Sequence, residues 1–577
     1  MKKSVAVIVI LFVAVAIKAF GFSVKDIKVV CDNPRDWKIS LEEVSSSDDV
    51  IIAKLDLKSV KDDIPPVVTL KWEMPQKNMF YMWTVNDSQF SILPMWCGWK
   101  TSELARGAPF FALIDNSNRS TFSLFVSDCL RHIKYRALAK EQSSLISCGL
   151  QFFTGTESPI KEYSTLIRFD LRSKDFCEVV REGVSWIDAE NEFSFCNVPS
   201  SAFDPLYSTW YNFHQNVSDT VIEKEAAIAS KLGMKVLILD DGWQTDDNNG
   251  AYAYCGDWEV SKNRFPDFAG HIKKVQEMGM KYLVWYSVPF VGKKSKNFDR
   301  FNGKYLYVND HLHAAVLDPR FPEVRQFLID TYVKALKEWN LDGFKLDFID
   351  HFNVIDDPAK KENYAGRDIK SIPVAVERLM VDIRKALTAI KSDILIEFRQ
   401  QYNGPAMRQF GNMFRVGDCP GHPRQNRIQI ANMRLACGRA AVHADMIEWN
   451  LNESTQDAAN RVINAIFGVV QYSVVLGKVP SQHRDMIAKW IKFSQDHREA
   501  LLMGKFTAHH PECAYPILVG ETDSERVVGV YLEDFLVEIN DDKTTFIMNA
   551  TQCDYVNVLH NGKFRRVACP AGDWIRL

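Results

Sequence analysis

Asp342-Gly343-Phe344-Lys345-Leu346-Asp347-Phe348-Ile349-Asp350 is an apolar run with charges set inside it, and it decides the fold. The apolar residues predict a buried strand. Because side chains alternate along a strand, Lys345 and Asp347 project to the same side. A buried carboxylate is tolerated only when it is paired, hydrogen-bonded or functional. Asp347 is therefore the first catalytic candidate, and a structural ion pair is the alternative.

Further apolar strand cores occur on both sides of this stretch. Amphipathic helical stretches, among them 220–232, 322–339 and 373–390, separate apolar strand cores. The strand cores lie at 206–213, 235–240, 281–288, 343–348, 393–398, 413–416, 441–447 and 472–476. Strands alternating with helices predict a parallel sheet, and eight such units predict a (β/α)8 TIM barrel with its active site at the carboxyl ends of the strands.

Short β-branched runs broken by turn residues flank this barrel. They occur at 50–55, 67–72 and 120–126 before it and at 526–532 and 544–548 after it. Such runs predict an N-terminal β-sandwich and a small C-terminal β domain. The predicted divisions are 1–22 for a signal peptide, 23–200 for the N-terminal β-sandwich, 201–500 for the catalytic barrel and 501–577 for a C-terminal β-sandwich.

Composition favours a neutral partner. The 577 residues carry 70 basic and 73 acidic side chains, a net charge of -3, so nothing in the overall charge indicates nucleic acid or an anionic membrane. Hydrophobic residues make up 46% of the chain, which is ample for the cores of several domains. A neutral substrate is the simpler expectation.

The amino terminus has the build of a secretory signal peptide. Met1-Lys2-Lys3 precedes an apolar run at 5–17, and small residues follow at Ala19 and Gly21. The apolar run is short for a membrane span, and an uncleaved anchor is the alternative. We therefore expect an exported protein, periplasmic or secreted, with no membrane attachment after cleavage.

No cofactor or metal is predicted. The 12 cysteines are scattered without a CxxC pair, so they signal neither a zinc site nor a disulfide framework. Five histidines fall on different predicted loops, and satisfied or exposed side chains are the expectation for them. They are His311, His313, His351, His422 and His443.

Polar and aromatic side chains crowd the predicted strand ends. Carboxylates and arginines bind hydroxyls through charge-assisted hydrogen bonds, and indole rings offer apolar faces to a pyranose. The pattern therefore indicates a sugar site. Its members are Trp210, Asp240, Asp241, Trp243, Trp285, Lys345, Asp347, Glu397, Arg399, Arg415, Asp418, His443, Asp445 and Trp449.

Asp347 and Asp418 are the natural pair for glycoside cleavage. One carboxylate can attack the anomeric carbon while the other protonates the departing oxygen. Lys345 is expected to help keep Asp347 ionised, and the less charged surroundings of Asp418 are compatible with the raised pKa that an acid needs. Asp445 is expected either to bind substrate or to brace Asp418.

Four motifs, in order, resemble the melibiase clan, glycoside hydrolase families 36 and 27. They are Asp240-Asp241-Gly242-Trp243, Gly256-Asp257-Trp258 followed by Phe265-Pro266, Gly279-Met280-Lys281-Tyr282-Leu283-Val284-Trp285, and the stretch from Asp342 to Asp347. The resemblance covers roughly positions 206 to 476 of the chain. It implies a retaining α-galactosidase-like exo-hydrolase with flanking β domains.

The resemblance also implies roles for individual residues. Asp347 would be the nucleophile and Asp418 the acid/base. Asp240 and Asp241 would bind the 4- and 6-hydroxyls of the sugar. Lys345 and Arg415 would bind further ring hydroxyls, with Trp210, Trp258 and Trp285 as the walls. Arg399 and Asp445 are further predicted binding residues, from their places at the strand ends.

The sequence departs from the family pattern after the fifth strand. Glu397-Phe398-Arg399-Gln400-Gln401-Tyr402 replaces a glycine-rich stretch, and Gly417-Asp418-Cys419 replaces Ser-Asp-Asp. Those parts touch the C2 side of the sugar in the family. The alternatives are therefore an α-N-acetylgalactosaminidase, a β-L-arabinopyranosidase, a transglycosylase and, from another class, a non-catalytic carbohydrate-binding protein.

Overall fold

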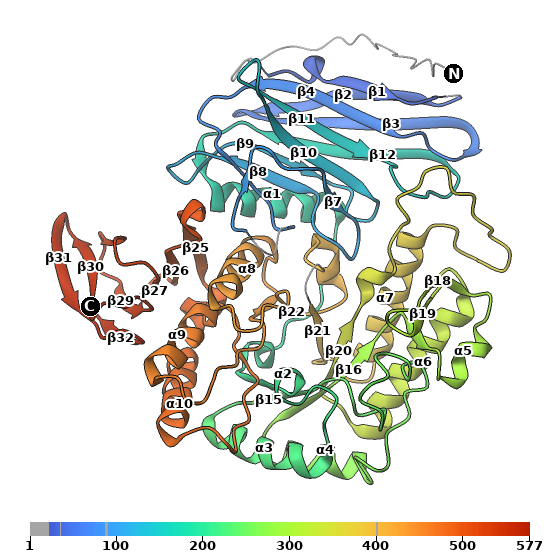
Figure 1. Ribbon diagram of the computed structural model, residues 1–577. Helices are drawn as coiled ribbons and strands as arrows, with labels where there is room; N and C mark the ends of the chain where they lie inside the picture. Colours follow the sequence, from blue (N-terminus) through green and yellow to red (C-terminus); the bar gives the residue numbers. More distant parts are fainter. Residues whose placement is uncertain (1–21, 35, 87–89, 400–401) are drawn as a thin grey trace.

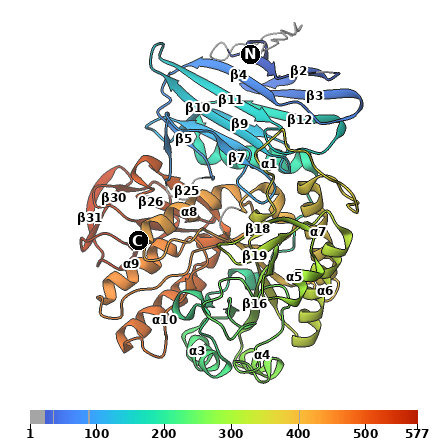
Figure 2. The same cartoon turned by 45° about the vertical axis from the view of Figure 1, so that its right-hand side comes forward.

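The computed structural model describes residues 22–577 except 35, 87–89 and 400–401. The predicted signal peptide lies outside the described residues except for its last position. Figure 1 shows a β-sandwich above a barrel, with a smaller β domain beside the barrel, and Figure 2 shows the same layers from a second side. Within the described part of the chain, no helix is both apolar and long enough to cross a membrane.

Two antiparallel sheets form the N-terminal β-sandwich. In spatial order, the first contains β1 (Lys28–Cys31), β4 (Val68–Pro75), β11 (Leu145–Phe152), β10 (Ile133–Lys140) and β7 (Lys100–Ser102). The second contains β2 (Lys38–Ser47), β3 (Val50–Asp63), β12 (Ile160–Asp170), β9 (Arg119–Val126), β8 (Phe110–Ile114), β5 (Tyr81–Trp83) and β6 (Leu93–Pro94), with β13 (Lys174–Asp175) beside β9. Side chains of β3 alternate between buried and less buried, as one face turned to a core requires.

Eight parallel strands form the barrel, one from each predicted strand core. They are β14 (Leu206–Ser208), β15 (Val236–Leu239), β16 (Lys281–Ser287), β20 (Gly343–Asp347), β21 (Leu395–Arg399), β22 (Met413–Arg415), β23 (Ala441–His443) and β24 (Gln471–Tyr472). β24 pairs with β14, and parallel bridges from 443 to 469 and from 447 to 472 bring β23 to β24. The predicted multidomain fold with a central TIM barrel is confirmed.

Helices surround this barrel, and α1 (Phe176–Asn191) lies between it and the sandwich (Figure 1). The others are α3 (Asp219–Leu232), α4 (Phe268–Glu277), α6 (Pro322–Trp339), α7 (Ile372–Thr388), α8 (Pro423–Ala436), α9 (Thr455–Ala465) and α10 (Ser481–Asp496). A small antiparallel sheet between β16 and β20 contains β17 (Phe290–Gly292), β19 (Ala314–Leu317) and β18 (Tyr305–Asn309), with α5 (Lys296–Arg300) between its strands.

The first barrel strand is shorter than the predicted range of 206–213. The observed strand ends at Ser208, and residues 210–213 form the short helix α2 (Trp210–Phe213). The backbone N–H of Tyr211 donates to Ser473 Oγ at 3.2 Å, so the chain turns across the barrel rim toward the last strand. Trp210 therefore lies on a helix at the rim rather than inside a strand.

Gly343 shows why the central strand needs its glycine. A Cβ at this position would lie 2.2 Å from the carbonyl oxygen of Leu395 on the neighbouring strand β21. Any side chain would push β20 and β21 apart, and these strands carry Lys345, Asp347 and Arg399. The glycine thus keeps the charged strand ends within reach of one another.

Two further sheets build the C-terminal β domain around a small core of its own. The first contains β25 (Lys505–His509), β26 (Ile517–Glu521), β27 (Glu525–Val530), β29 (Thr544–Asn549) and β32 (Asp573–Arg576). The second contains β28 (Leu536–Ile539), β30 (Tyr555–His560) and β31 (Lys563–Ala568). Val528 and Ile547 pack with Val556 and Val558 between them. The exact domain boundaries near 200 and 500 stay predictions.

Candidate active site

The Asp347 carboxylate ends strand β20 and is held by three donors. Trp285 Nε1 donates to Oδ2 at 2.9 Å, and the backbone N–H of Phe348 donates to Oδ1 at 2.6 Å. Arg399 Nε also donates to Oδ1. Phe348 has a φ of 63°, an unfavourable conformation for a bulky residue that is typical of functional sites. Asp347, only 5% exposed, is therefore fixed in orientation with a cation beside it.

Lys345 binds Asp240 rather than Asp347. Its Nζ donates to Asp240 Oδ2 at 2.6 Å, and both side chains are buried. Lys345 was expected to help keep Asp347 ionised, but its direct ion-pair partner is Asp240. Lys345 pairs in register with Glu397, two residues before the strand end, so its side chain enters the barrel one layer deeper than Asp347. Arg399, from the next strand, takes the place beside Asp347.

Asp241 is a buried carboxylate fixed by two amides. Gln215 Nε2 donates to Oδ2 at 2.7 Å and Gln244 Nε2 donates to Oδ1 at 2.5 Å. Burial raises the pKa of Asp241 to about 6, although these two hydrogen bonds oppose the shift. Gly242 follows with a φ of 116°, and a Cβ there would lie 2.6 Å from the Gln215 backbone. Only glycine therefore lets the backbone after Asp241 lie this close to Gln215.

Asp418 lies at the rim in a strongly cationic setting. Arg415 donates to Asp418 Oδ1 at 2.8 Å, and the Asp418 side chain is 47% exposed. Burial would raise the pKa of Asp418, but the charges of Arg415, Arg399 and Lys345 outweigh it and hold this pKa below its usual value. The predicted less charged surroundings of Asp418 are therefore wrong, because the sequence did not show that these three cations converge on this carboxylate.

Asp445 is fully buried and braces the loop that carries Asp418. Its carboxylate accepts from Arg415, from Tyr211 Oη at 2.7 Å and from the backbone N–H of Cys419 at 2.6 Å. Of the two roles expected from the sequence, substrate binding and bracing, this geometry favours bracing. Arg415 is shared between Asp445 and Asp418, so it fixes the position of the exposed carboxylate.

The three predicted tryptophans occupy different depths. Trp210 is partly exposed on α2 and stacks on His214, with ring centroids 4.7 Å apart. Trp285 is buried against Asp347. Trp258 contacts the Trp285 ring edge at 6.1 Å between centroids and also lines a cavity along α6, outside the barrel. Trp258 thus supports Trp285, while Trp210 has the more accessible ring.

A polar cluster fills the barrel beneath these carboxylates. Gln471 Nε2 donates to Glu397 Oε2 at 2.5 Å, and His443 Nε2 contacts the carbonyl of Ala202 at 2.8 Å. Burial raises the pKa of Glu397 to about 7, with Lys345 opposing the shift, and burial lowers the pKa of His443 to about 4. Burial therefore favours the uncharged form of both side chains.

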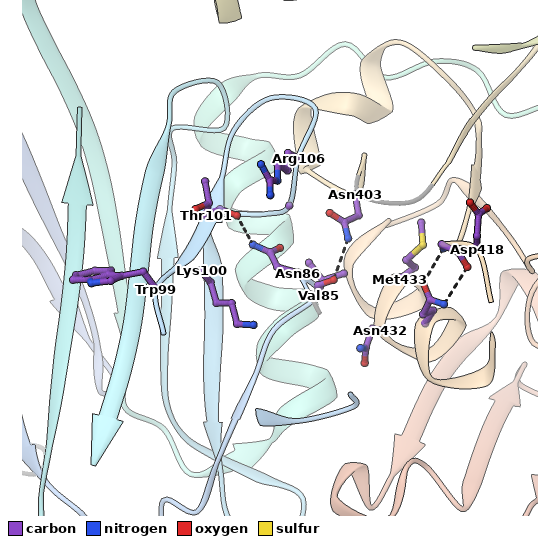
Figure 3. Close-up of a pocket in the computed structure, with 13 residues that line it drawn as sticks. Val85, Asn86, Trp99, Lys100, Thr101, Arg106, Asn403, Asp418, Asn432 and Met433 are labelled. Atoms are coloured by element: carbon purple, nitrogen blue, oxygen red, sulfur yellow. Dashed lines mark hydrogen bonds between the residues drawn. The ribbon is translucent and has the colours of Figure 1, made fainter. Parts of the chain in front are cut away.

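A cavity of about 420 Å³ opens beside Asp418, between the barrel and the N-terminal β-sandwich (Figure 3). The barrel contributes Asn403, Gly417, Gln429, Asn432 and Met433 besides Asp418, and the sandwich contributes Val85, Asn86, Trp99, Lys100, Thr101, Arg106 and Gly107. The exposed carboxylate therefore faces a space that two domains enclose.

No metal centre emerges among the residues that the structure describes, since they contain no group of three or more His, Cys, Asp or Glu that could hold an ion. Two of the five histidines named from the sequence have hydrogen-bond partners that fix them, and His443 is the one described above. The other is His351, whose Nδ1 lies 3.0 Å from Tyr307 Oη. All 12 cysteines are present as free thiols.

The structure brings most of the predicted site residues together at one end of the barrel, with Asp445 and Trp258 set behind the others. Sequence reasoning missed Gln215 and Gln244, which hold Asp241, and Tyr211, which holds Asp445. The position of Gln244 soon after the Asp-Asp-Gly-Trp motif was an available signal. Nothing in the sequence pointed to the N-terminal residues of the cavity.

Comparison with known proteins finds one protein family whose model matches the barrel. The family model described as Melibiase matches residues 203–504, more than half of the chain. α-Galactosidase Mel36A of Lactobacillus acidophilus is 24% identical over 351 residues, which are 56% of this chain and 45% of that protein. α-Galactosidase AgaA of Geobacillus stearothermophilus is 25% identical over 313 residues, 52% of this chain and 42% of that protein. The aligned parts thus span less than half of these relatives.

Solved structures resemble the whole architecture. A variant of AgaA from Geobacillus stearothermophilus in complex with raffinose has a TM-score of 0.67 at 15% identity, and the match covers 96% of this chain and 82% of that one. A second AgaA variant, in complex with stachyose, also has a TM-score of 0.67 at 14% identity, with 96% and 83% covered. At these identities the likeness shows the shared fold.

Proposed function

The chain belongs to the melibiase family, and from this premise we propose that it is a retaining exo-glycoside hydrolase. It releases terminal α-linked galactose from oligo- or polysaccharides through a covalent glycosyl-aspartate intermediate. The observation that carries the proposal is the arrangement of Asp347, held by three donors inside the barrel mouth, with the exposed Asp418 on the same rim.

Asp347 acts as the nucleophile. Its orientation is set by Trp285 and by the Phe348 N–H, so one carboxylate oxygen can be aimed at the anomeric carbon without a search through rotamers. Arg399 stabilises the carboxylate before attack. In the intermediate the oxygen forms an ester with the sugar, the negative charge is lost, and Arg399 becomes free to bind a sugar hydroxyl.

Asp418 acts as the acid and then as the base. Arg415 and two further cations hold the pKa of Asp418 below its usual value, and its carboxyl is exposed. A leaving group that packs against Asp418 excludes water, and loss of hydration raises the pKa of a carboxyl. The bound substrate thus favours the protonated acid that cleavage needs, and departure of the leaving group restores the carboxylate that activates water.

Asp240 and Asp241 recognise the donor sugar. Both carboxylates are buried and oriented, Asp240 by Lys345 and Asp241 by Gln215 and Gln244. They can accept hydrogen bonds from an axial 4-hydroxyl and from a 6-hydroxyl. A site built to bond a hydroxyl rejects an analogue that cannot supply the bond, because its own polar groups stay unpaired.

We expect the kcat/KM for p-nitrophenyl α-galactoside to exceed that for the matched α-glucoside by about a hundredfold or more. Asp241→Ala is expected to narrow this gap, mainly through lost activity on the galactoside. Asp246→Ala is a matched control, because Asp246 lies in the same loop and binds Ser261 and Asn263 instead. The gap should stay wide in that variant. A clear preference of the wild type for the glucoside would overturn the sugar assignment.

We further propose that the protein is exported, to the periplasm or beyond. The proposal rests on Met1-Lys2-Lys3 and the apolar run at 5–17. The amino-terminal sequence of the protein purified from the culture medium or periplasm is expected to begin near residue 22. A chain that keeps Met1 in the cell interior would contradict it.

A further inference from the structure

The segment that follows the nucleophile is attached to the N-terminal β-sandwich. The chain between β20 and α7 rises from the barrel toward the sandwich (Figures 1 and 2). The backbone N–H of Thr156 donates to the carbonyl of Ile355 at 2.7 Å, and Thr156 Oγ1 donates to the carbonyl of Asp357 at 3.0 Å. Lys134 Nζ donates to Asp356 Oδ2 at 2.6 Å. Three consecutive residues of this segment are therefore bound to another domain.

Apolar contacts continue this attachment back toward the nucleophile. Phe352 and Val354 are 5% and 7% exposed. They line a small cavity together with Leu104 and Leu130 of the sandwich. Residues 352–357, here called the docked segment, are thus held by side-chain packing at one end and by hydrogen bonds at the other.

Gly155 lies where the sandwich and the docked segment approach closely. A Cβ at this position would lie 2.6 Å from Val354 Cγ1 and 3.1 Å from the carbonyl oxygen of Ile355. The turn that carries the glycine is itself fixed, because Glu157 accepts from Arg131 Nη1 at 2.9 Å. A side chain at Gly155 would therefore displace the docked segment rather than the turn.

The first residue after the nucleophile is held in a strained conformation. Phe348 donates its backbone N–H to Asp347 Oδ1 at 2.6 Å, with a φ of 63°. Such a conformation is costly for a bulky residue and persists only when its surroundings over-determine it. The Phe348 ring packs on Phe290, with centroids 4.7 Å apart, and lies 4.5 Å from the Arg399 guanidinium carbon. The ring contacts and the docked segment thus hold this backbone from two sides.

We propose that the N-terminal β-sandwich positions the nucleophile through the docked segment, with Gly155 and Thr156 as positioning residues. The inference rests on the proposed function. Docking fixes the path of the chain as it leaves the barrel, so the Phe348 N–H stays aimed at Asp347 and one carboxylate oxygen stays in line with the anomeric carbon. A small misplacement of a reacting atom slows the chemical step without weakening the binding of the sugar. The sandwich therefore acts on the rate of the first step.

Gly155→Ala tests this role by forcing the docked segment away from the sandwich. We expect the rate constant for forming the intermediate from p-nitrophenyl α-galactoside to fall about tenfold or more, since a shift of ~1 Å can cost about a hundredfold. The inhibition constant of galactose is expected to stay that of the wild type, because Asp240 and Asp241 are oriented by barrel side chains. The measurements are pre-steady-state kinetics and competitive inhibition.

Val354→Ala is the complementary change, because it removes the atom that the new Cβ would meet. The double variant Gly155→Ala/Val354→Ala is expected to recover most of the lost rate. Gly98→Ala is the matched control. It makes the same change in the same domain, at an exposed position where a Cβ would meet nothing within 4 Å. Its rate constant and its galactose inhibition should equal those of the wild type.

Thr156→Val tests the same contact without a clash. Valine keeps the shape of the side chain but loses the hydroxyl that donates to the carbonyl of Asp357. We expect a several-fold loss of the same rate constant, with galactose inhibition again unchanged. If Gly155→Ala does not fold, a wild-type rate constant in Thr156→Val alone overturns the positioning role.

The outcomes separate the two proposals. Wild-type rate constants in folded Gly155→Ala and Thr156→Val overturn the positioning role and leave the proposed function standing. A loss of galactose affinity as large as the loss of rate also overturns it, because the contact then supports the whole site rather than the nucleophile. If the wild type cleaves no α-galactoside, the proposed function fails and takes the positioning role with it.

Discussion

Asp347→Asn is expected to lower kcat on p-nitrophenyl α-galactoside by about a thousandfold or more while the protein stays folded, because an amide is nearly isosteric with the carboxylate but is a poor nucleophile. The amide also loses the ion pair with Arg399. The measurement is steady-state kinetics, with circular dichroism and thermal unfolding to confirm the fold.

Asp350→Asn is the matched control for that experiment. Asp350 lies three residues further along and binds Tyr402 Oη at 2.8 Å, so the same chemical change is made in the same segment. Its kcat should change little. External azide is expected to restore part of the activity of Asp347→Ala, because the small anion can occupy the place of the missing carboxylate. Near wild-type activity of Asp347→Asn would show that another residue is the nucleophile.

Asp418→Ala is expected to reduce cleavage of raffinose by about 10² to 10⁴, the contribution typical of a general acid. Formation of the intermediate from an aryl galactoside with a good leaving group should suffer much less, because that group needs little protonation. The measurement is the rate of the glycosylation step on both substrates. Asp310→Ala, which removes an exposed partner of Lys293, is the control and should affect neither rate.

Asp418→Asn separates the chemical role of this residue from its contact with Arg415. The amide oxygen can still accept from Arg415, which otherwise stays buried with Asp445 alone. The asparagine variant should therefore keep the fold and show the same dependence on the leaving group. Equal losses on both substrates would mean that Asp418 is not the acid. Asp445 is a poor replacement, because it is fully buried and already accepts three hydrogen bonds.

The sequence was sufficient for the barrel because its strands are short apolar cores separated by strongly periodic helices. The helix predicted at 322–339 has those bounds in the structure, since a proline at its first turn and Asn340 in a left-handed conformation mark its ends. The end of the first strand was not predictable. Three of the four residues at 210–213 are aromatic and could continue a strand, but in the structure they form a helix whose Tyr211 N–H donates to Ser473 across the rim.

Site residues were predictable where they depend on strand ends alone. Asp347, Asp240 and Asp241 follow from the rule that parallel strands present their carboxyl ends on one rim. The pairing of cations with acids was not predictable, because it depends on the depth at which each long side chain enters the barrel. Lys345, which was expected to support Asp347, binds Asp240, and Arg399 is the cation that binds Asp347.

The cavity beside Asp418 was beyond the reach of sequence reasoning. Asn403 and Asn432 come from separate loops and helices of the barrel, and Arg106 comes from the sandwich nearly 300 residues earlier. Their neighbourhood is created by the docking of two domains, which no local pattern encodes. Single asparagines and arginines are also common surface residues, so their residue type did not indicate that they line a cavity.

The central claim is that Asp347 forms the bond to the sugar. The most direct test is to trap the intermediate with a fluorinated α-galactosyl donor that carries an activated leaving group, then to digest the protein and map the modified peptide by mass spectrometry. The account predicts one galactosyl-derived adduct, on Asp347, and none on the Asp347→Asn variant. An adduct on a different residue, with Asp347 unmodified in protein that the reagent has inactivated, would contradict it.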